Sequence, residues 1–173
     1  TVAAIALVLQ LLIAIPLGIL AARKQYSATD YIITGLVFLG LSLPTFFFAA
    51  VLKRIFGYYG LDLLPISGML TARVTYPDHM TWAKFLDYAQ HLILPITVFV
   101  ITGLGSMLRY TRTNMLEVLN ADYIRTARAK GLSEHKVIYH HAFRNTLIPL
   151  VTIVGGSLPG LFSGALITET LFS

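Results

Sequence analysis

The chain has 173 residues, of which 56% are hydrophobic and only 12% are charged, and its formal net charge is +5. Soluble domains carry roughly 25% charged residues, so this composition excludes an ordinary water-exposed domain. It also excludes a disordered chain, because disorder requires low hydrophobicity and high charge. The absence of cysteine excludes disulfide scaffolds, thiolate metal sites and cysteine nucleophiles. The mean hydropathy of +0.74 indicates a membrane protein.

Four stretches of the sequence contain no Asp, Glu, Lys or Arg. At about 1.5 Å per residue, a helix of about 21 residues reaches the hydrocarbon thickness of a bilayer. We therefore predict an all-α, polytopic bundle of transmembrane helices. The third stretch is short, and it becomes long enough to cross the bilayer when His91 lies at the interface between membrane and water. The expected spans are residues 2–22, 31–52, 91–108 and 145–168.

The connecting segments differ in length and charge. By the positive-inside rule, basic residues gather on the cytoplasmic side. Nine basic residues lie in the first and third connections and four in the second, so residues 53–90 are expected to form an external loop and residues 109–144 a cytoplasmic one. The chain starts without Met and ends in apolar sequence, and we expect residues 1–173 to be an internal part of a longer transmembrane domain.

Proline and glycine mark the expected spans. Five prolines lie within or beside them, and interior prolines kink helices, although prolines are also common in membrane helices. Glycines recur every fourth residue in the last span, which lets another helix approach closely. That helix could belong to the same subunit or to a second one. The prolines are Pro16, Pro44, Pro95, Pro149 and Pro159, and the glycines are Gly156, Gly160 and Gly164.

The cytoplasmic loop has the pattern of two helices joined by a glycine turn. Residues 117–130 place apolar or small side chains on one helix face, at Leu116, Leu119, Tyr123 and Ala127. Gly131 can adopt the positive φ that ends a helix. Ser133 is placed to cap a second helix that runs toward residue 143.

Neither a catalytic site nor a metal site is expected in this chain. Ionisable groups at membrane depth are usually functional, and the four apolar stretches have none. His135, His140 and His141 are better explained as interfacial or docking residues, because adjacent histidines point about 100° apart on a helix and have no acidic partner at a ligand spacing.

Three functions are open for the loop on this reasoning. A basic helix-turn-helix suggests nucleic-acid binding, but the segment is tethered to the membrane at both ends, and its charge is what the orientation requires. A merely solvated loop is the second. The third is a rigid docking element for a cytoplasmic partner, which would transmit motion into the spans. We favour the third and expect no nucleic-acid partner.

Two motifs of the loop resemble the coupling loop of permeases of ATP-binding-cassette importers, specifically the first (B-type) subunit of the dipeptide/oligopeptide/nickel family. They are residues 123–132 (YIRTARAKGL) and 141–149 (HAFRNTLIP). Three other segments are similar to family landmarks, so that the resemblance covers the chain from about residue 23 to its end. These are residues 64–68 (LPISG), 91–95 (HLILP) and 168–173 (TETLFS).

The loop departs from the general importer pattern, which has Glu-Ala-Ala six residues before its glycine. Arg125-Thr126-Ala127 stands there, so only Ala127 and Gly131 match. The later Ile-x-Leu-Pro of the general pattern is absent from residues 141–144. The departure is typical of the peptide/nickel branch, but no role can be transferred for the missing glutamate.

The resemblance implies a six-span permease in a bacterial or archaeal inner membrane, of which this chain holds four spans. It implies pairing with a homologous second permease, delivery of solute by an extracytoplasmic binding protein, and two cytoplasmic ATP-binding subunits that hold ATP and Mg. This chain itself is expected to bind no cofactor. The residues expected to couple it to the ATPases are Tyr123, Arg125, Ala127, Gly131 and Leu132.

Uncharged polar residues in and beside the spans are the weaker candidates for a translocation path, because helix–helix hydrogen bonds explain them nearly as well. They are Gln10, Ser42, Thr45, Ser157 and Ser163. The alternative function is an ATP-independent channel or a structural membrane subunit, which has no use for the helix–glycine–helix loop. A membrane enzyme ranks third. The sequence leaves the cargo open among dipeptide, longer peptide, nickel complex or another small solute.

Overall fold

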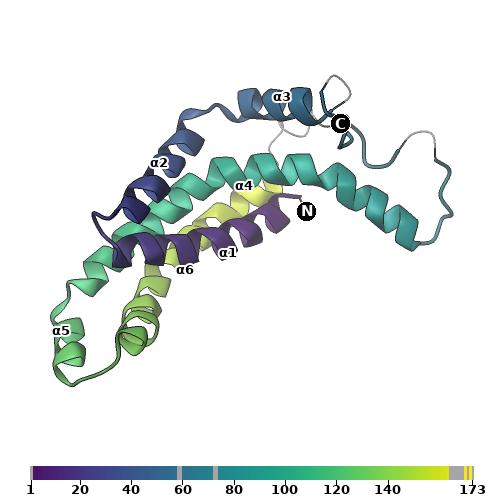
Figure 1. The fold of residues 1–173 in the computed structure, drawn as a ribbon. Coiled ribbons are helices and arrows are strands. Elements are labelled where there is room, and N and C mark those ends of the chain that lie inside the picture. Colours follow the sequence, from purple (N-terminus) through teal and green to yellow (C-terminus); the bar gives the residue numbers. More distant parts are fainter. Residues whose placement is uncertain (1, 58–59, 72–73, 164–169, 171, 173) are drawn as a thin grey trace. The chain divides into compact units, whose positions relative to one another are not determined.

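The computed structural model describes residues 2–57, 60–71, 74–163, 170 and 172, and of residues 158–163 it describes the backbone alone. All regular secondary structure in these ranges is helical (Figure 1), as the composition predicts. The elements are α1 (Val2–Arg23), α2 (Ala28–Ser42), α3 (Thr45–Phe56), α4 (Trp82–Leu119), α5 (Asp122–Ala129), a π-helix η1 (Lys136–Ala142) and α6 (Phe143–Ser163).

The first expected span is a continuous helix. α1 covers residues 2–23 and passes through Pro16 without interruption. It is followed by a tight turn in which Tyr26 takes a left-handed conformation with φ 62°. The hydroxyl of Ser27 donates a 2.6 Å hydrogen bond to the carbonyl of Lys24 and also accepts the N–H of Asp30 in the first turn of α2.

The second expected span, residues 31–52, is two helices rather than one. α2 ends at Ser42 and α3 starts at Thr45, with Pro44 as its N-cap at φ −59° and ψ 134°. The pyrrolidine ring clashes with a helical conformation at the preceding residue, which explains why the helix cannot run through. The interruption expected at Pro44 is therefore a complete break between two helices.

α4 is far longer than the third expected span of residues 91–108. It has 38 residues and continues through Pro95, and at about 1.5 Å per residue it is roughly 57 Å long. The charged residues that bound the apolar stretch, such as Lys84 and Arg112, therefore lie in the same helix rather than in loops. Helix propensity is high for Lys, Arg and Glu, so charge marks where apolar sequence ends but not where a helix ends.

Length and composition identify α1 and α4 as candidate membrane spans within the described residues. α2 and α3 together form a third candidate as one interrupted span. α6 covers residues 143–163, and residues 164–168, expected to complete the fourth span, lie outside the described residues.

The chain forms two compact units, and α1, α4 and α6 each contribute to both. One unit comprises residues 1–9, 42–102 and 160–173, and the other comprises residues 10–41 and 103–159. The core of the first unit contains Ala49 and Leu52 of α3, Leu94 and Val98 of α4, and Phe172.

A buried carboxylate holds the segment that precedes α4 in the first unit against that helix. Asp87, 7% exposed, accepts the backbone N–H of Thr71 at 2.8 Å and its hydroxyl at 2.7 Å. The Nδ1 atom of His91, one turn further on, lies 3.4 Å from Oδ1 of Asp87. Thr71 is thus fixed to the start of α4 by polar contacts.

In the second unit, four helices share one apolar core. Ala14 and Ala21 of α1 pack with side chains from α2, α4 and α6, namely Ile33, Val37, Met107, Leu108 and Leu150. α1 and α4 approach closely at Gly18, where a Cβ atom would lie 2.6 Å from Cβ of Thr111. Small residues at such contacts let membrane helices pack backbone to backbone.

Candidate functional site: the loop between α4 and α6

The loop is built from a short helix between two breaks. α4 ends at Leu119, and Asn120 donates a 2.9 Å side-chain hydrogen bond to the carbonyl of Leu116. Ala121 is extended, and α5 then begins with Asp122 in its first turn and has Arg128 in its last. These charges complement the helix dipole. The single helix expected over residues 117–130 was wrong, because it is interrupted at residues 120–121.

The glycine turn after α5 is as predicted. Gly131 has φ +77°, in the left-handed region that glycine adopts most readily. A helix restarts directly after it, where the backbone N–H of Lys136 lies 3.5 Å from Oγ of Ser133. This second helix contains η1 and continues into α6 (Figure 1).

One face of α5 is anchored to the ends of the neighbouring helices. Ile124 is fully buried and Ala127 is 7% exposed. Both belong to a cluster with Ile19 and Ala22 of α1, Met115 of α4, and Val137, Ile138 and Ala142 of η1. We call this the loop core. It joins the loop to α1 and α4, so that α5 is a fixed protrusion of the helix bundle.

The opposite face of α5 is exposed. Tyr123 is 46% exposed, and the Arg125 side chain is 74% exposed with Nη1 3.6 Å from Oδ1 of Asp122. Leu132 is half-buried against the loop core. The five coupling residues predicted from the sequence therefore divide into two groups. Tyr123, Arg125 and Gly131 are accessible, whereas Ala127 and Leu132 pack against the loop core.

Sequence reasoning missed Ile124, the most buried residue of α5. Its neighbour Tyr123 was assigned to the inner face because residues 117–130 were treated as one helix. The interruption at residues 120–121 resets the helical phase, and the inner face of α5 then falls on Ile124 and Ala127. The apolar character of Ile124 was the available signal.

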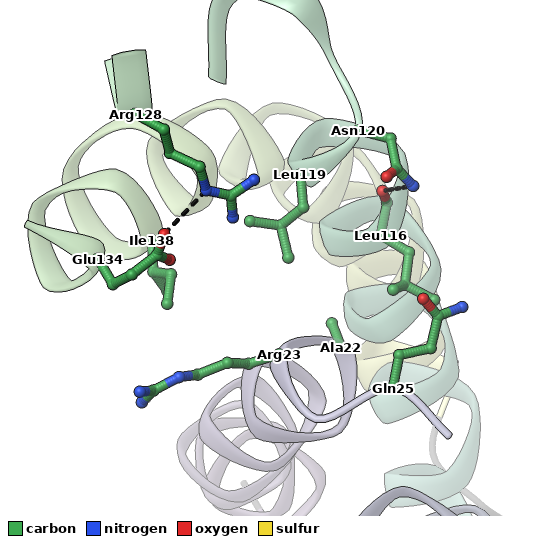
Figure 2. Close-up of a pocket in the computed structure, with 9 residues that line it drawn as sticks. All are labelled: Ala22, Arg23, Gln25, Leu116, Leu119, Asn120, Arg128, Glu134 and Ile138. Atoms are coloured by element: carbon green, nitrogen blue, oxygen red, sulfur yellow. Dashed lines mark hydrogen bonds and ion pairs between the residues drawn. The ribbon is translucent and has the colours of Figure 1, made fainter. Parts of the chain in front are cut away.

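A pocket of about 240 Å³ opens where α5 and η1 meet the ends of α1 and α4 (Figure 2). Ala22, Leu119 and Ile138 present apolar side chains to it from three different elements, and Gln25 and Asn120 add amide groups. Arg128 and Glu134 bridge across the Gly131 turn on one side, with Nε 2.9 Å from Oε1. The pocket is thus lined by both apolar and polar side chains.

The three histidines of this region lie apart from any carboxylate cluster. His135 packs its ring against Tyr139, with centroids 4.7 Å apart, and His140 and His141 meet edge to face. Across the described residues, no group of three or more His, Asp or Glu side chains is arranged to hold a metal ion.

The glycine stripe of α6 is described at one of its three positions. A Cβ at Gly156, or at the adjacent Gly155, would meet nothing within 4 Å. Ile148 and Val151, on the same helix, are 69% and 66% exposed. The surroundings of Gly160 lie outside the described side chains, and Gly164 lies outside the described residues.

The predicted path residues are divided between the two units. Gln10 packs over Gly103 of α4, with its Nε2 atom where a Cβ of that glycine would be, and Ser157 donates a 2.7 Å hydrogen bond to the carbonyl of Val154. Ser42 and Thr45 flank the break between α2 and α3. The side chain of Ser163 lies outside the described part of the chain. A role in a translocation path stays a prediction for all five.

Comparison with known proteins assigns the chain to a family. The oligopeptide transport system permease protein AppB of Bacillus subtilis is 40% identical over 166 residues, which are 96% of this chain and 50% of that protein. The dipeptide transport system permease protein DppB of Escherichia coli K12 is 39% identical over 93% of this chain and 51% of its own length.

A di/tripeptide permease protein of Pseudomonas aeruginosa is also 39% identical, over 90% of this chain and 49% of its own length. The chain thus spans about half the length of these curated relatives. Its residues 14–173 match the family described as binding-protein-dependent transport system inner membrane component. The chain belongs to this family of inner-membrane transport components.

Proposed function

We propose that the whole protein is the multi-pass transmembrane subunit of an ATP-driven importer in a bacterial or archaeal inner membrane. It carries peptides or related small solutes by alternating access between inward-open and outward-open states. A homologous permease pairs with it, and a solute-binding protein delivers cargo from outside. Two cytoplasmic subunits bind ATP and Mg and carry out the hydrolysis, so that this chain is not itself an enzyme.

The observation that carries the proposal is the two-faced geometry of α5. Its inner side chains, Ile124 and Ala127, are buried against α1 and α4, while Tyr123 and Arg125 extend outward. A force applied to the outer face therefore reaches two long apolar helices through close-packed contacts, and packed interiors transmit displacement because they are nearly incompressible. A solvated loop would need no such anchor.

The family and the peptide permeases among its relatives support peptide cargo. The exposed face of α6 that holds Gly155, Val151 and Ile148 supports close packing against a second permease. The nine-to-four distribution of basic residues supports a cytoplasmic position for α5.

The test is co-purification and transport by the full-length protein, produced together with the proposed partner subunits. We expect Tyr123→Ala combined with Arg125→Glu to lose the ATPase from detergent-solubilised complexes and to abolish ATP-dependent uptake in proteoliposomes. Lys24→Glu is the matched control, because Lys24 is an exposed cation of the turn between α1 and α2 and should leave both intact.

Two results would contradict the proposal. One is normal ATPase binding and uptake by the double variant. The other is solute flux through the wild-type protein that needs no ATP, which would establish the channel alternative.

A further inference from the structure

An ion pair joins α2 to α4 across 82 residues of sequence. Arg112 of α4 donates two parallel hydrogen bonds to Asp30 of α2, from Nε to Oδ1 and from Nη2 to Oδ2, each 2.7 Å long. Asp30 is 3% exposed, and the Arg112 side chain is 25% exposed. Bidentate pairs of this kind fix the relative orientation of their partners as well as the distance.

Asp30 also organises the turn that leads into α2. Its carboxylate accepts the backbone N–H of Tyr26 at 3.0 Å, and its own N–H points at Oγ of Ser27. The Arg112 guanidinium holds the pKa of Asp30 below its ordinary value, so the carboxylate stays charged at neutral pH. Through Asp30, Arg112 is thus connected both to the turn and to the start of α2.

The pair lies next to the loop core along α4. Met115, one turn beyond Arg112, is fully buried in that core with Ile124 and Ala127 of α5. On the other side, Thr111 contacts Gly18 of α1, so α1 and α4 are already in close contact at this level. α2 contributes no buried residue to the loop core. A movement of α5 therefore reaches α1 and α4 directly but reaches α2 only through α4 and its neighbours.

Two kinds of contact connect α2 to those neighbours. Ile33 and Val37 pack into the shared apolar core of the second unit. Close-packed apolar contacts transmit displacement, but they are non-directional and do not by themselves fix how one helix is rotated relative to another. The Arg112–Asp30 fork is directional and breaks when the helices turn relative to each other. It is therefore the contact that makes α2 turn with α4.

We propose that Asp30 and Arg112 are positioning residues for transport, which make α2 move with α4 when α5 is displaced, so that the solute moved per ATP hydrolysed depends on their bidentate contact. The inference rests on the proposed function. It assigns to the pair a role in coupling, distinct from the exposed docking face of α5, and it predicts that ATPase binding survives when the pair is broken.

The experiment uses the full-length protein in its assembled importer, reconstituted in proteoliposomes, with uptake and ATP hydrolysis measured on the same vesicles. Arg112→Lys keeps the positive charge but cannot form the fork, because ammonium is a point charge. Asp30→Asn keeps an oxygen acceptor for the turn but loses the negative charge. Arg109→Lys, an exposed arginine one turn earlier on α4, is the matched control.

We expect both pair variants to lower the uptake per ATP hydrolysed about fivefold or more, the lower range of typical coupling between sites. The ATPase should still co-purify, and the ATP hydrolysis rate should stay within about twofold of the wild type. Arg109→Lys should match the wild type in all three measurements.

Three results would overturn the inference. The first is an unchanged ratio of uptake to hydrolysis in both variants. The second is a parallel fall of uptake, hydrolysis and thermal stability, which would make the pair a static element of the fold. The third is loss of the ATPase from the pair variants alone, which would place the pair in docking. Wild-type vesicles without ATP-driven uptake would overturn the proposed function and this inference together.

Discussion

Gly18 of α1 lies directly against Thr111 of α4, so that a Cβ added to the glycine would be 2.6 Å from Cβ and 2.7 Å from Cγ2 of the threonine. Thr111 is fully buried, and its hydroxyl donates a 2.9 Å hydrogen bond to the carbonyl of Met107. The β-branched side chain has little freedom to give way. The close contact between α1 and α4 thus depends on the absence of a side chain at Gly18.

We therefore expect Gly18→Ala to lower the free energy of unfolding by about 1–3 kcal/mol, the usual cost of overpacking. Thermal unfolding of the full-length protein in detergent would measure it. Gly35→Ala in α2 is the control, because a Cβ there meets nothing within 4 Å. It should be neutral or stabilising by up to about 1 kcal/mol, since alanine favours a helix over glycine. Equal effects of both substitutions would contradict the close contact.

Ala127→Asp and Ala129→Asp should differ sharply although they are two residues apart on α5. Ala127 belongs to the loop core, whereas Ala129 is exposed. An unpaired charge in the core would cost about 4 kcal/mol or more, among the largest effects of single substitutions. Limited proteolysis of the loop should therefore accelerate in Ala127→Asp and stay near wild type in Ala129→Asp. Similar cleavage rates in both would show that α5 is not anchored on this face.

Gly131 should tolerate asparagine better than alanine. A Cβ at this position meets nothing within 4 Å, so the only obstacle is the φ of +77°. The left-handed region costs ordinary residues about 1–2 kcal/mol, and asparagine adopts it more readily than alanine does. We expect Gly131→Ala to lower the melting temperature and Gly131→Asn to lower it less. The reverse order would show that space, not backbone conformation, selects the glycine.

The contact between Asp87 and Thr71 should weaken in acid. The hydrogen bond from the Thr71 N–H lowers the pKa of Asp87 below its ordinary value. The stabilisation is therefore fully present above the unfolded pKa of about 3.9 and is lost as the pH falls through the lower, folded pKa.

Hydrogen exchange at the Thr71 amide would measure this, after correction for the intrinsic dependence of exchange on pH. Protection should fall as the pH drops below about 4 in the wild type, which is the unfolded pKa of an aspartate. In Asp87→Asn it should not change with pH. If protection of the Thr71 amide is independent of pH in the wild type as well, the charge of the Asp87 carboxylate does not contribute to the contact.

Local features of the fold could be predicted from the sequence. The positive φ of Gly131 followed from the ability of glycine to end a helix, and α1 followed from an uninterrupted apolar stretch. The length of α4 could not be predicted from charge, because the residues that close its apolar stretch are good helix formers.

Polar contacts between residues far apart in the chain could not be predicted from the sequence. Nothing in either segment indicates that Asp30 and Arg112, 82 residues apart, form a bidentate pair, because each is an ordinary charged residue at the end of an apolar stretch. The same holds for Asp87 and Thr71, which are joined by folding of the segment that precedes α4. The Gly131 turn was predicted correctly, but the inner side of α5 was assigned one residue out of phase.

The π-helical turns of η1 determine which way α6 faces. Val137 and Ala142 are both fully buried, five residues apart, and Ala142 is followed at intervals of four by buried Thr146 and Leu150. In an uninterrupted α-helix, residues five apart lie about 140° away from each other around the axis. The wider turns bring them onto one side. A π-helix is equivalent to one inserted residue, so the deletion of a single residue within 136–142 would leave a regular α-helix whose inner side is preserved. The orientation of the last helix is thus specified by one extra residue in the loop that precedes it.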